Sequence, residues 1–180
     1  MEKKEISQRK ILLDGDVISH FIKGELFDLL PKLYQNRLII LDIVKTEIYQ
    51  RKGWDTVIEG LIQKHGIEEI KFPEEIDFKK EYSYLISSSG YALGKGESAC
   101  MVYCRFNQDI LASSNLKDIH RYCSLHKIEY LTTGDILFEG FTKGLVKMAD
   151  CDAFITKVKN KGSKFRFNTM KELIAAMKPI

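Results

Sequence analysis

The sequence has little of several features that mark specialised classes of protein. Its 180 residues include only 3 Pro and 12 Gly, against 44% hydrophobic and 29% charged residues. This composition excludes collagen-like repetition and an intrinsically disordered chain. No apolar run approaches the roughly 20 residues of a membrane-spanning helix, and the charged opening segment does not resemble a signal peptide. We therefore expect a soluble, cytoplasmic protein without membrane contact.

The few cysteines argue against a disulfide-stabilised protein and against a zinc site, and the small net charge indicates no particular partner. The 4 Cys residues lack the spacing of a disulfide framework, so we expect buried thiols. Cys100 and Cys104 share a helix face, but no second Cys or His pair follows at a matching spacing, which argues against a zinc site. The charge of +3 from 28 basic and 25 acidic residues selects no particular partner.

Strand and helix patterns alternate along the chain. Short apolar runs predict strands at 10–13, 37–41, 67–72, 109–112 and 128–131, the third of them at an edge of the sheet. Helical spacing predicts helices at 17–33, 42–51, 74–87, 97–106, 115–125, 135–143, 150–159 and 169–177. No repeat or long linker interrupts this order. We predict one α/β domain over residues 1–180, with a mostly parallel sheet of four or five strands between helices on both faces.

Acidic and amide residues follow the ends of the predicted strands. Parallel strands place their carboxyl ends at one edge of the sheet, where ligands of such folds bind. Several carboxylates gathered there would repel one another unless a divalent cation is bound. Oxygen ligands favour Mg²⁺ or Mn²⁺ over zinc. The residues concerned are Asp14, Asp16, Glu47, Glu97, Asn115 and Asp118.

Helix capping is the alternative explanation for acids at such positions. For Asp16, Asp118 and Asp135 taken singly, capping and function are equally good explanations. Asp14 differs, because it lies in a segment of apolar residues where an unpaired charge is expensive, and this favours a functional role. An exposed helical position is the default for Glu47, and only its agreement with the other acids favours a role in a site.

Four segments resemble, in order, the motifs of the PIN-domain (VapC-like) nuclease family. ILLDGDVISHF resembles the first motif, LIILDIVKTEI the second, GKGESACMVYC the Gly-x-Gly-Glu form of the third, and DILASSNLKDI the fourth. The resemblance covers a core of about 10–146, with 58–90 poorly matched and a helical extension at about 150–180. It implies a three-layer α/β/α PIN-like domain.

The resemblance further implies a ribonuclease that depends on Mg²⁺ or Mn²⁺, held by Asp14, Glu47 and Glu97. The family usually has Asp where this chain has Asn115, and Asp118 follows one helical turn later as a replacement ligand. Asn115 also leaves open a degenerate PIN-like domain that binds RNA or protein without cleaving it.

Basic residues near the acidic edge are candidates for contacts with RNA phosphates, although solvated surface lysines are the simpler explanation for each. The candidates are Lys45, Lys95 and Lys117. A denser basic run at 157–166, interleaved with Phe165 and followed by Phe167, fits either a single-stranded RNA contact or a solvated helix end with core-facing rings.

The family contains many toxins of toxin–antitoxin pairs, so the resemblance implies a small antitoxin as a partner, and symmetric association as a homodimer is the usual expectation. ILLDGDV also resembles the first motif of haloacid-dehalogenase-type phosphatases, with Asp14 as nucleophile and Asp16 as acid/base. In this chain only one strand–helix unit separates the segments that resemble the phosphatase family's second and last motifs. That family has a much longer stretch there, which argues against this alternative. A P-loop resemblance of GYALGKGES fails on glycine spacing and on the residue after Lys95.

Overall fold

Five short parallel strands form the centre of the protein in a computed structural model that describes residues 8–88 and 90–177. The strands are β1 (Ile11–Leu13), β2 (Leu38–Leu41), β3 (Glu68–Ile70), β4 (Ile110–Ala112) and β5 (Tyr130–Leu131). Their order is β3-β2-β1-β4-β5, and Leu12 of β1 pairs with both Ile39 and Leu111. The prediction of a parallel sheet with β3 at an edge is confirmed.

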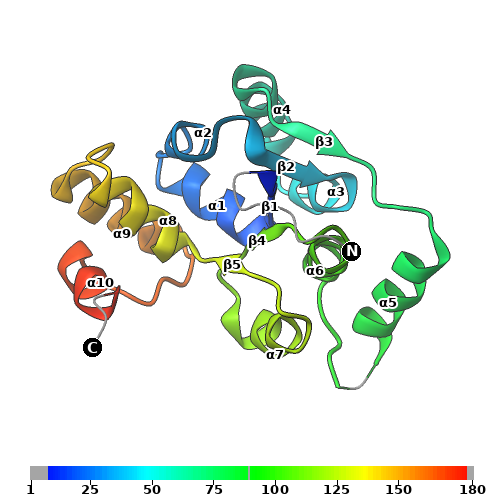
Figure 1. Ribbon diagram of the computed structural model, residues 1–180. Coiled ribbons are helices and arrows are strands. Elements are labelled where there is room, and N and C mark those ends of the chain that lie inside the picture. The colour runs from blue at the N-terminus through cyan, green and yellow to red at the C-terminus, as the bar shows by residue number, and fades with distance from the viewer. Residues whose placement is uncertain (1–7, 89, 178–180) are drawn as a thin grey trace.

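Helices cover both faces of this sheet (Figure 1). They are α1 (Gly15–Lys23), α2 (Leu29–Tyr34), the 3₁₀ turn η2 (Gln35–Arg37), α3 (Asp42–Tyr49), α4 (Trp54–His65), α5 (Ile76–Ser87), α6 (Lys95–Asn107), α7 (Leu116–His126), α8 (Thr133–Thr142), α9 (Met148–Asn160) and α10 (Met170–Met177). Helices α6 and α7 lie on one side, and α1, α2 and α8 on the other, with α9 packed against α1. The result is the predicted three-layer α/β/α arrangement.

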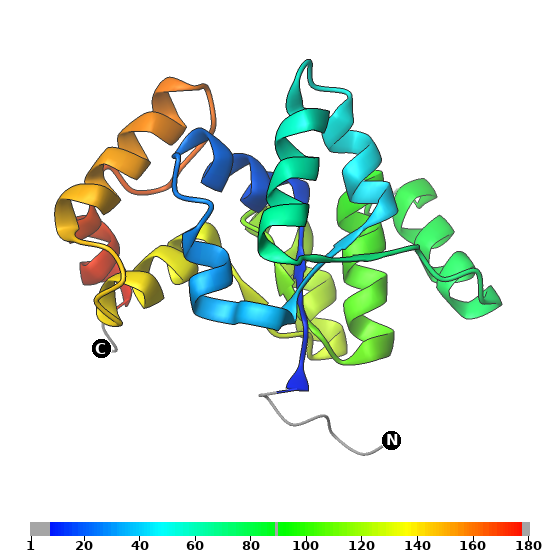
Figure 2. The ribbon, with the colours of Figure 1, turned by 90° about the horizontal axis from the view of Figure 1, so that it is seen from above.

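The ends of the molecule are formed by helices outside these layers. Helix α5 packs on α6 at one end, and α9 and α10 lie at the opposite end, as the views in Figures 1 and 2 agree. The core is apolar: β1, β2 and β4 are fully buried, and all four cysteines are buried free thiols, as predicted. Among the described residues, no helix is long and apolar enough to span a membrane.

The predicted single helix over 17–33 is wrong, because the chain breaks into α1 and α2. Helix α1 ends at Gly24, and Glu25 adopts a left-handed conformation with φ 58° that no helix can continue. Close packing accounts for a glycine at this position. A Cβ atom on Gly24 would lie 2.1 Å from the ring of Phe154 in α9, so only glycine lets the two helices approach this closely.

Helix α4 was not predicted, although the sequence contains a stop signal for it. Gly66 follows the helix with φ 59°, the left-handed geometry in which glycine commonly ends a helix. Within α4 only Ile58 and Ile62 are buried, so its apolar stripe is too narrow to stand out as a periodic pattern.

Two glycine substitutions test this account of packing. Gly24→Ala should lower the free energy of unfolding by about 1–3 kcal/mol, because the buried Phe154 ring cannot move away from the new methyl group. Gly60→Ala, in the middle of α4 with open space around it, should raise it by about 0.5–1 kcal/mol. Urea denaturation of both variants measures the difference, and equal effects of the two substitutions would contradict the close contact.

Candidate metal centre

The predicted acidic and amide residues meet in one cavity of about 260 Å³ at the carboxyl edge of the sheet. They come from the N-terminal turns of three helices and from the middle of a fourth. We call this the acidic cavity. Its lining includes Asp14, Asp16, Glu47, Glu97, Asn115 and Asp118, together with Arg51.

Asp14 and Asp16 are held by backbone N–H groups at the start of α1. Asp14 caps the helix, and its carboxylate accepts a hydrogen bond of 2.7 Å from the N–H of Gly15. Asp16 Oδ2 accepts one of 2.8 Å from the N–H of Ser114, in the loop after β4. These backbone contacts hold each carboxylate beside the sheet edge, and Ser113 adds a side-chain hydrogen bond to Asp14.

Glu47 and Glu97 meet through a glycine. The N–H of Gly96 donates to Glu47 Oε1 at 3.0 Å, and a Cβ atom on Gly96 would lie 2.4 Å from Glu47 Oε2. Only glycine lets the first turn of α6 approach α3 so closely. Glu97 follows directly and is 7% exposed, whereas Glu47 is exposed. This contact gives a physical reason for the second glycine of the GKGE motif.

Asn115 and Asp118 close the other side of the cavity at the start of α7. Asn115 Nδ2 donates to Asp118 Oδ2 at 2.7 Å, and a side-chain hydrogen bond from Asn115 also lowers the pKa of Glu97. The amide therefore bridges two carboxylates as a neutral donor. It stands where the resemblance expects a further charged ligand.

Crowding of carboxylates raises their pKa values. Burial, and then the charge of Asp16, raises the pKa of Asp14 from 3.8 to about 7. Burial raises that of Asp16 from 3.8 to about 6. For Glu97, burial and then the charge of Asp14 raise the pKa from 4.5 to about 8. Burial is the largest cause for all three groups, and the charge of neighbouring carboxylates adds to it for Asp14 and Glu97.

The donor set fits a hard divalent cation. Every candidate ligand atom is an oxygen, and Asp16 Oδ1 is buried without a hydrogen-bond partner among the described residues. A cation would satisfy that oxygen and offset the shared charge. In the described ranges, however, no three His, Cys, Asp or Glu side chains converge as ligands of one ion, so binding requires side-chain rotation.

The lysines proposed for RNA contact do not line this cavity. Lys45 forms ion pairs with Glu59 and Glu69, which engage its charge elsewhere. Lys95 and Lys117 are exposed in the first turns of α6 and α7, close to the rim.

Arg51 does line the cavity, and the sequence reasoning missed it. Its Nη1 donates to Ser19 Oγ at 2.8 Å, and its guanidinium lies 4.8 Å from the centre of the Trp54 ring. Its position four residues after Glu47 was the available signal.

Two comparisons give no match: no protein-family profile and no curated protein matches the chain. Solved structures do match. VapBC-1 from nontypeable Haemophilus influenzae aligns with a TM-score of 0.51 and 12% identity, over 68% of this chain and 97% of that chain. DNA-bound VapBC from Salmonella typhimurium aligns with a TM-score of 0.53 and 15% identity, over 69% and 98%. The fold is therefore VapC-like. At these identities the likeness extends to the fold alone, and the Gly-x-Gly-Glu branch stays a prediction.

The raised pKa values predict that the metal-free protein loses stability as pH rises. Folded Asp14 and Glu97 hold protons that the unfolded chain has released above its ordinary values of 3.8 and 4.5. The free energy of unfolding should therefore fall as pH rises through about 7 to 8 and then level off. Urea midpoints measured in EDTA between about pH 6.5 and pH 9 test this.

Two controls accompany the pH series. Asp14→Asn cannot release a proton at this position, so its midpoint should depend less on pH. Mn²⁺ should raise the wild-type midpoint more at the alkaline end, because it binds ionised carboxylates. A wild-type midpoint that rises with pH in EDTA would contradict the charge crowding.

Asn115→Asp tests whether residue 115 occupies a ligand position. The added carboxylate should tighten Mn²⁺ binding by about tenfold, since affinity follows the number of charged ligands, and should destabilise the metal-free protein. Isothermal titration calorimetry measures the affinity, with Asn160→Asp at the end of α9 as the matched control. Unchanged affinity would assign the ligand role to Asp118 instead.

Proposed function

We propose that this protein is a ribonuclease that depends on Mg²⁺ or Mn²⁺ and hydrolyses phosphodiester bonds of single-stranded RNA. One observation carries the proposal: carboxylates from four separate elements line a single cavity at the carboxyl edge of a VapC-like sheet. A phosphodiester is itself anionic, so this cavity can accept one only when a cation offsets its charge.

Asp14, Glu47 and Glu97 hold the cation in this proposal, and Asp118 completes the set from α7. Asp16 offers the unpartnered Oδ1 and keeps its Oδ2 on the Ser114 N–H. When bound, a divalent cation lowers the pKa of a coordinated water and stabilises negative charge on the phosphodiester. No side-chain nucleophile is then needed.

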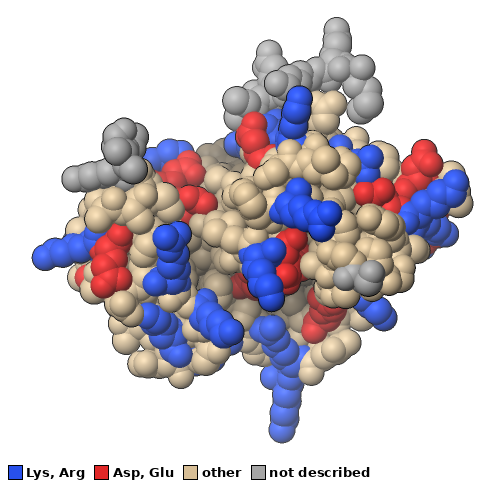
Figure 3. All heavy atoms as spheres, turned by 90° about the horizontal axis from the view of Figure 1, so that it is seen from below, with Lys and Arg blue, Asp and Glu red and all other residues tan. Residues whose placement is uncertain are grey.

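Basic side chains of this chain position the RNA backbone. Arg51 is fixed at the cavity by Ser19 and Trp54, and its remaining donors can bind a phosphate oxygen. Lys95 and Lys117 are exposed, and each is the immediate sequence neighbour of a residue that lines the cavity. Figure 3 shows Lys and Arg side chains, with Asp and Glu side chains among them, around a hollow on the face that includes α7 and α10. Such contacts favour binding that weakens with salt and depends little on sequence.

A protein partner is part of the proposal. The two solved structures described above are VapBC complexes, and this supports a small partner of the antitoxin type. The alternative is a domain that binds RNA or protein without cleaving RNA. It predicts that neither the wild-type chain nor any variant cleaves RNA in the presence of a divalent ion.

Asp14→Asn and Glu97→Gln should each lower cleavage of single-stranded RNA by about a hundredfold or more, because loss of a ligand should cost at least as much as loss of a residue that orients one. Mn²⁺ binding, measured by calorimetry, should weaken in parallel. Asp55→Asn, an exposed acid on α4, is the matched control and should leave both unchanged. If a variant keeps full metal-dependent cleavage, the substituted residue is not a metal ligand.

A further inference from the structure

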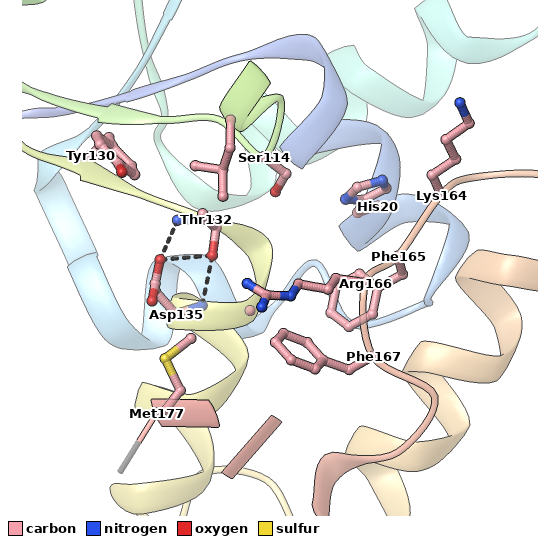
Figure 4. A pocket seen from close by; sticks show the side chains of 12 residues that line it. His20, Ser114, Tyr130, Thr132, Asp135, Lys164, Phe165, Arg166, Phe167 and Met177 are labelled. Atoms are coloured by element: carbon pink, nitrogen blue, oxygen red, sulfur yellow. Dashed lines mark hydrogen bonds between the residues drawn. The ribbon is translucent and has the colours of Figure 1, made fainter. Parts of the chain in front are cut away.

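A second cavity, of about 310 Å³, adjoins the acidic cavity. It lies between His20 of α1, Tyr130 of β5, the start of α8 and the segment 164–167 before α10 (Figure 4). We call it the aromatic pocket. Ser114 and Leu116 line it, while Asn115 between them lines the acidic cavity. The two cavities are therefore neighbours across one short loop.

Aromatic rings form the walls of this pocket. The ring of Phe165 meets those of His20 and Phe167 edge to face, with centroids 6.2 Å apart in both pairs. Phe165 and Phe167 are half-buried, so part of each ring remains open. Figure 4 shows Tyr130 on the other side of the pocket. Partly exposed ring faces of this kind are the surfaces on which unpaired bases stack.

Two cations of the pocket have no anionic partner. Lys164 and Arg166 are exposed, and neither forms a hydrogen bond or ion pair with another described residue. Arg166 lies over the Phe167 ring, 5.3 Å from its centre, and points into the pocket, whereas Lys164 extends outward (Figure 4). By contrast, Lys157 and Lys161 both pair with Glu25. The free donors of Arg166 and Lys164 suit a phosphate.

The floor of the pocket is hydrogen-bonded to the acidic cavity. His20 Nδ1 contacts Thr133 Oγ1 at 2.9 Å, and Thr133 Oγ1 contacts Ser114 Oγ at 2.8 Å. The N–H of Ser114 then donates to Asp16. Burial lowers the pKa of His20 to about 4, so this ring is neutral at pH 7 and contributes an aromatic edge instead of charge. The pocket is therefore held in a fixed position relative to the candidate ligands.

We infer that the aromatic pocket binds one unpaired base of single-stranded RNA, stacked against Phe167, while Arg166 and Lys164 bind the adjoining phosphates. This inference rests on the proposed function for the identity of the chain that enters the acidic cavity. RNA is favoured over a peptide because open ring faces and unpaired cations occur together, beside a site suited to a phosphodiester. A base held here places the next phosphate toward residues 114–116.

The test measures binding without cleavage. A fluorescently labelled single-stranded RNA is titrated with the full chain in EDTA, and anisotropy gives the affinity. Phe167→Ala should weaken binding by about tenfold, as expected for the loss of one stacked base. Arg166→Gln should reduce the magnitude of the slope of log affinity against log salt concentration by about 1, the value expected for the loss of one phosphate contact. Tyr84→Ala, an exposed ring on α5, is the matched control and should change neither.

A second variant and a second RNA make the result specific. Phe167→Leu retains apolar packing but offers no ring, so it should weaken binding while keeping the wild-type melting temperature. The wild-type chain should prefer RNA with bases over RNA with abasic sites, and both Phe167 variants should lose part of that preference.

The outcomes separate this inference from the proposed function. Unchanged RNA affinity in both Phe167 variants overturns the inference and leaves the pocket to a protein partner, even if the wild-type chain cleaves RNA. Weakened binding in these variants, together with no cleavage by the wild-type chain in Mg²⁺ or Mn²⁺, supports the inference and contradicts the proposed nuclease activity.

Discussion

Repulsion between carboxylates at one edge of the sheet is the constraint on which the functional region depends. Asp14, Asp16 and Glu97 are largely removed from water, which raises the pKa of each, and neighbouring carboxylates raise the pKa values of Asp14 and Glu97 further. The fold offsets part of this cost with backbone N–H groups, at Gly15, Ser114 and Gly96. The remainder is unfavourable charge, and under the proposed function a divalent cation would neutralise it.

The sheet topology makes this crowding possible. With β1 between β2 and β4, the loops after three neighbouring strands open at one place. Helix α6 reaches the same place from the loop after α5, and Gly96 lacks the Cβ atom that would lie 2.4 Å from Glu47 Oε2. Asn115 then joins Glu97 and Asp118 with an uncharged group. An aspartate at position 115 would add a carboxylate to this group.

The aromatic pocket lies directly beside the acidic cavity. Residues 114–116 border both cavities. In the proposal, an RNA strand bound at one cavity therefore lies close to the other. Most of the acidic groups, together with Arg51, line the acidic cavity. The rings, Lys164 and Arg166 line the aromatic pocket, where Asp135, the one acidic side chain among its described lining residues, caps helix α8 through Thr132. In the proposed function and the inference that rests on it, Lys164 and Arg166 would hold the RNA backbone while a metal ion offsets the charge of the acidic cavity.

The sequence by itself determined the alternation of strands and helices, the parallel sheet and the residues of the acidic cavity, because strand ends of a parallel sheet share one edge. Whether those residues hold metal stays a prediction. Tertiary structure decided what local patterns do not encode: the break at Gly24 beneath Phe154, the pairing of Lys45 with glutamates, and the place of Arg51. The aromatic pocket also forms only in the tertiary structure, because its walls come from segments more than a hundred residues apart, such as those with His20 and Phe165. Such contacts depend on how helices pack, and packing is a property of the whole chain.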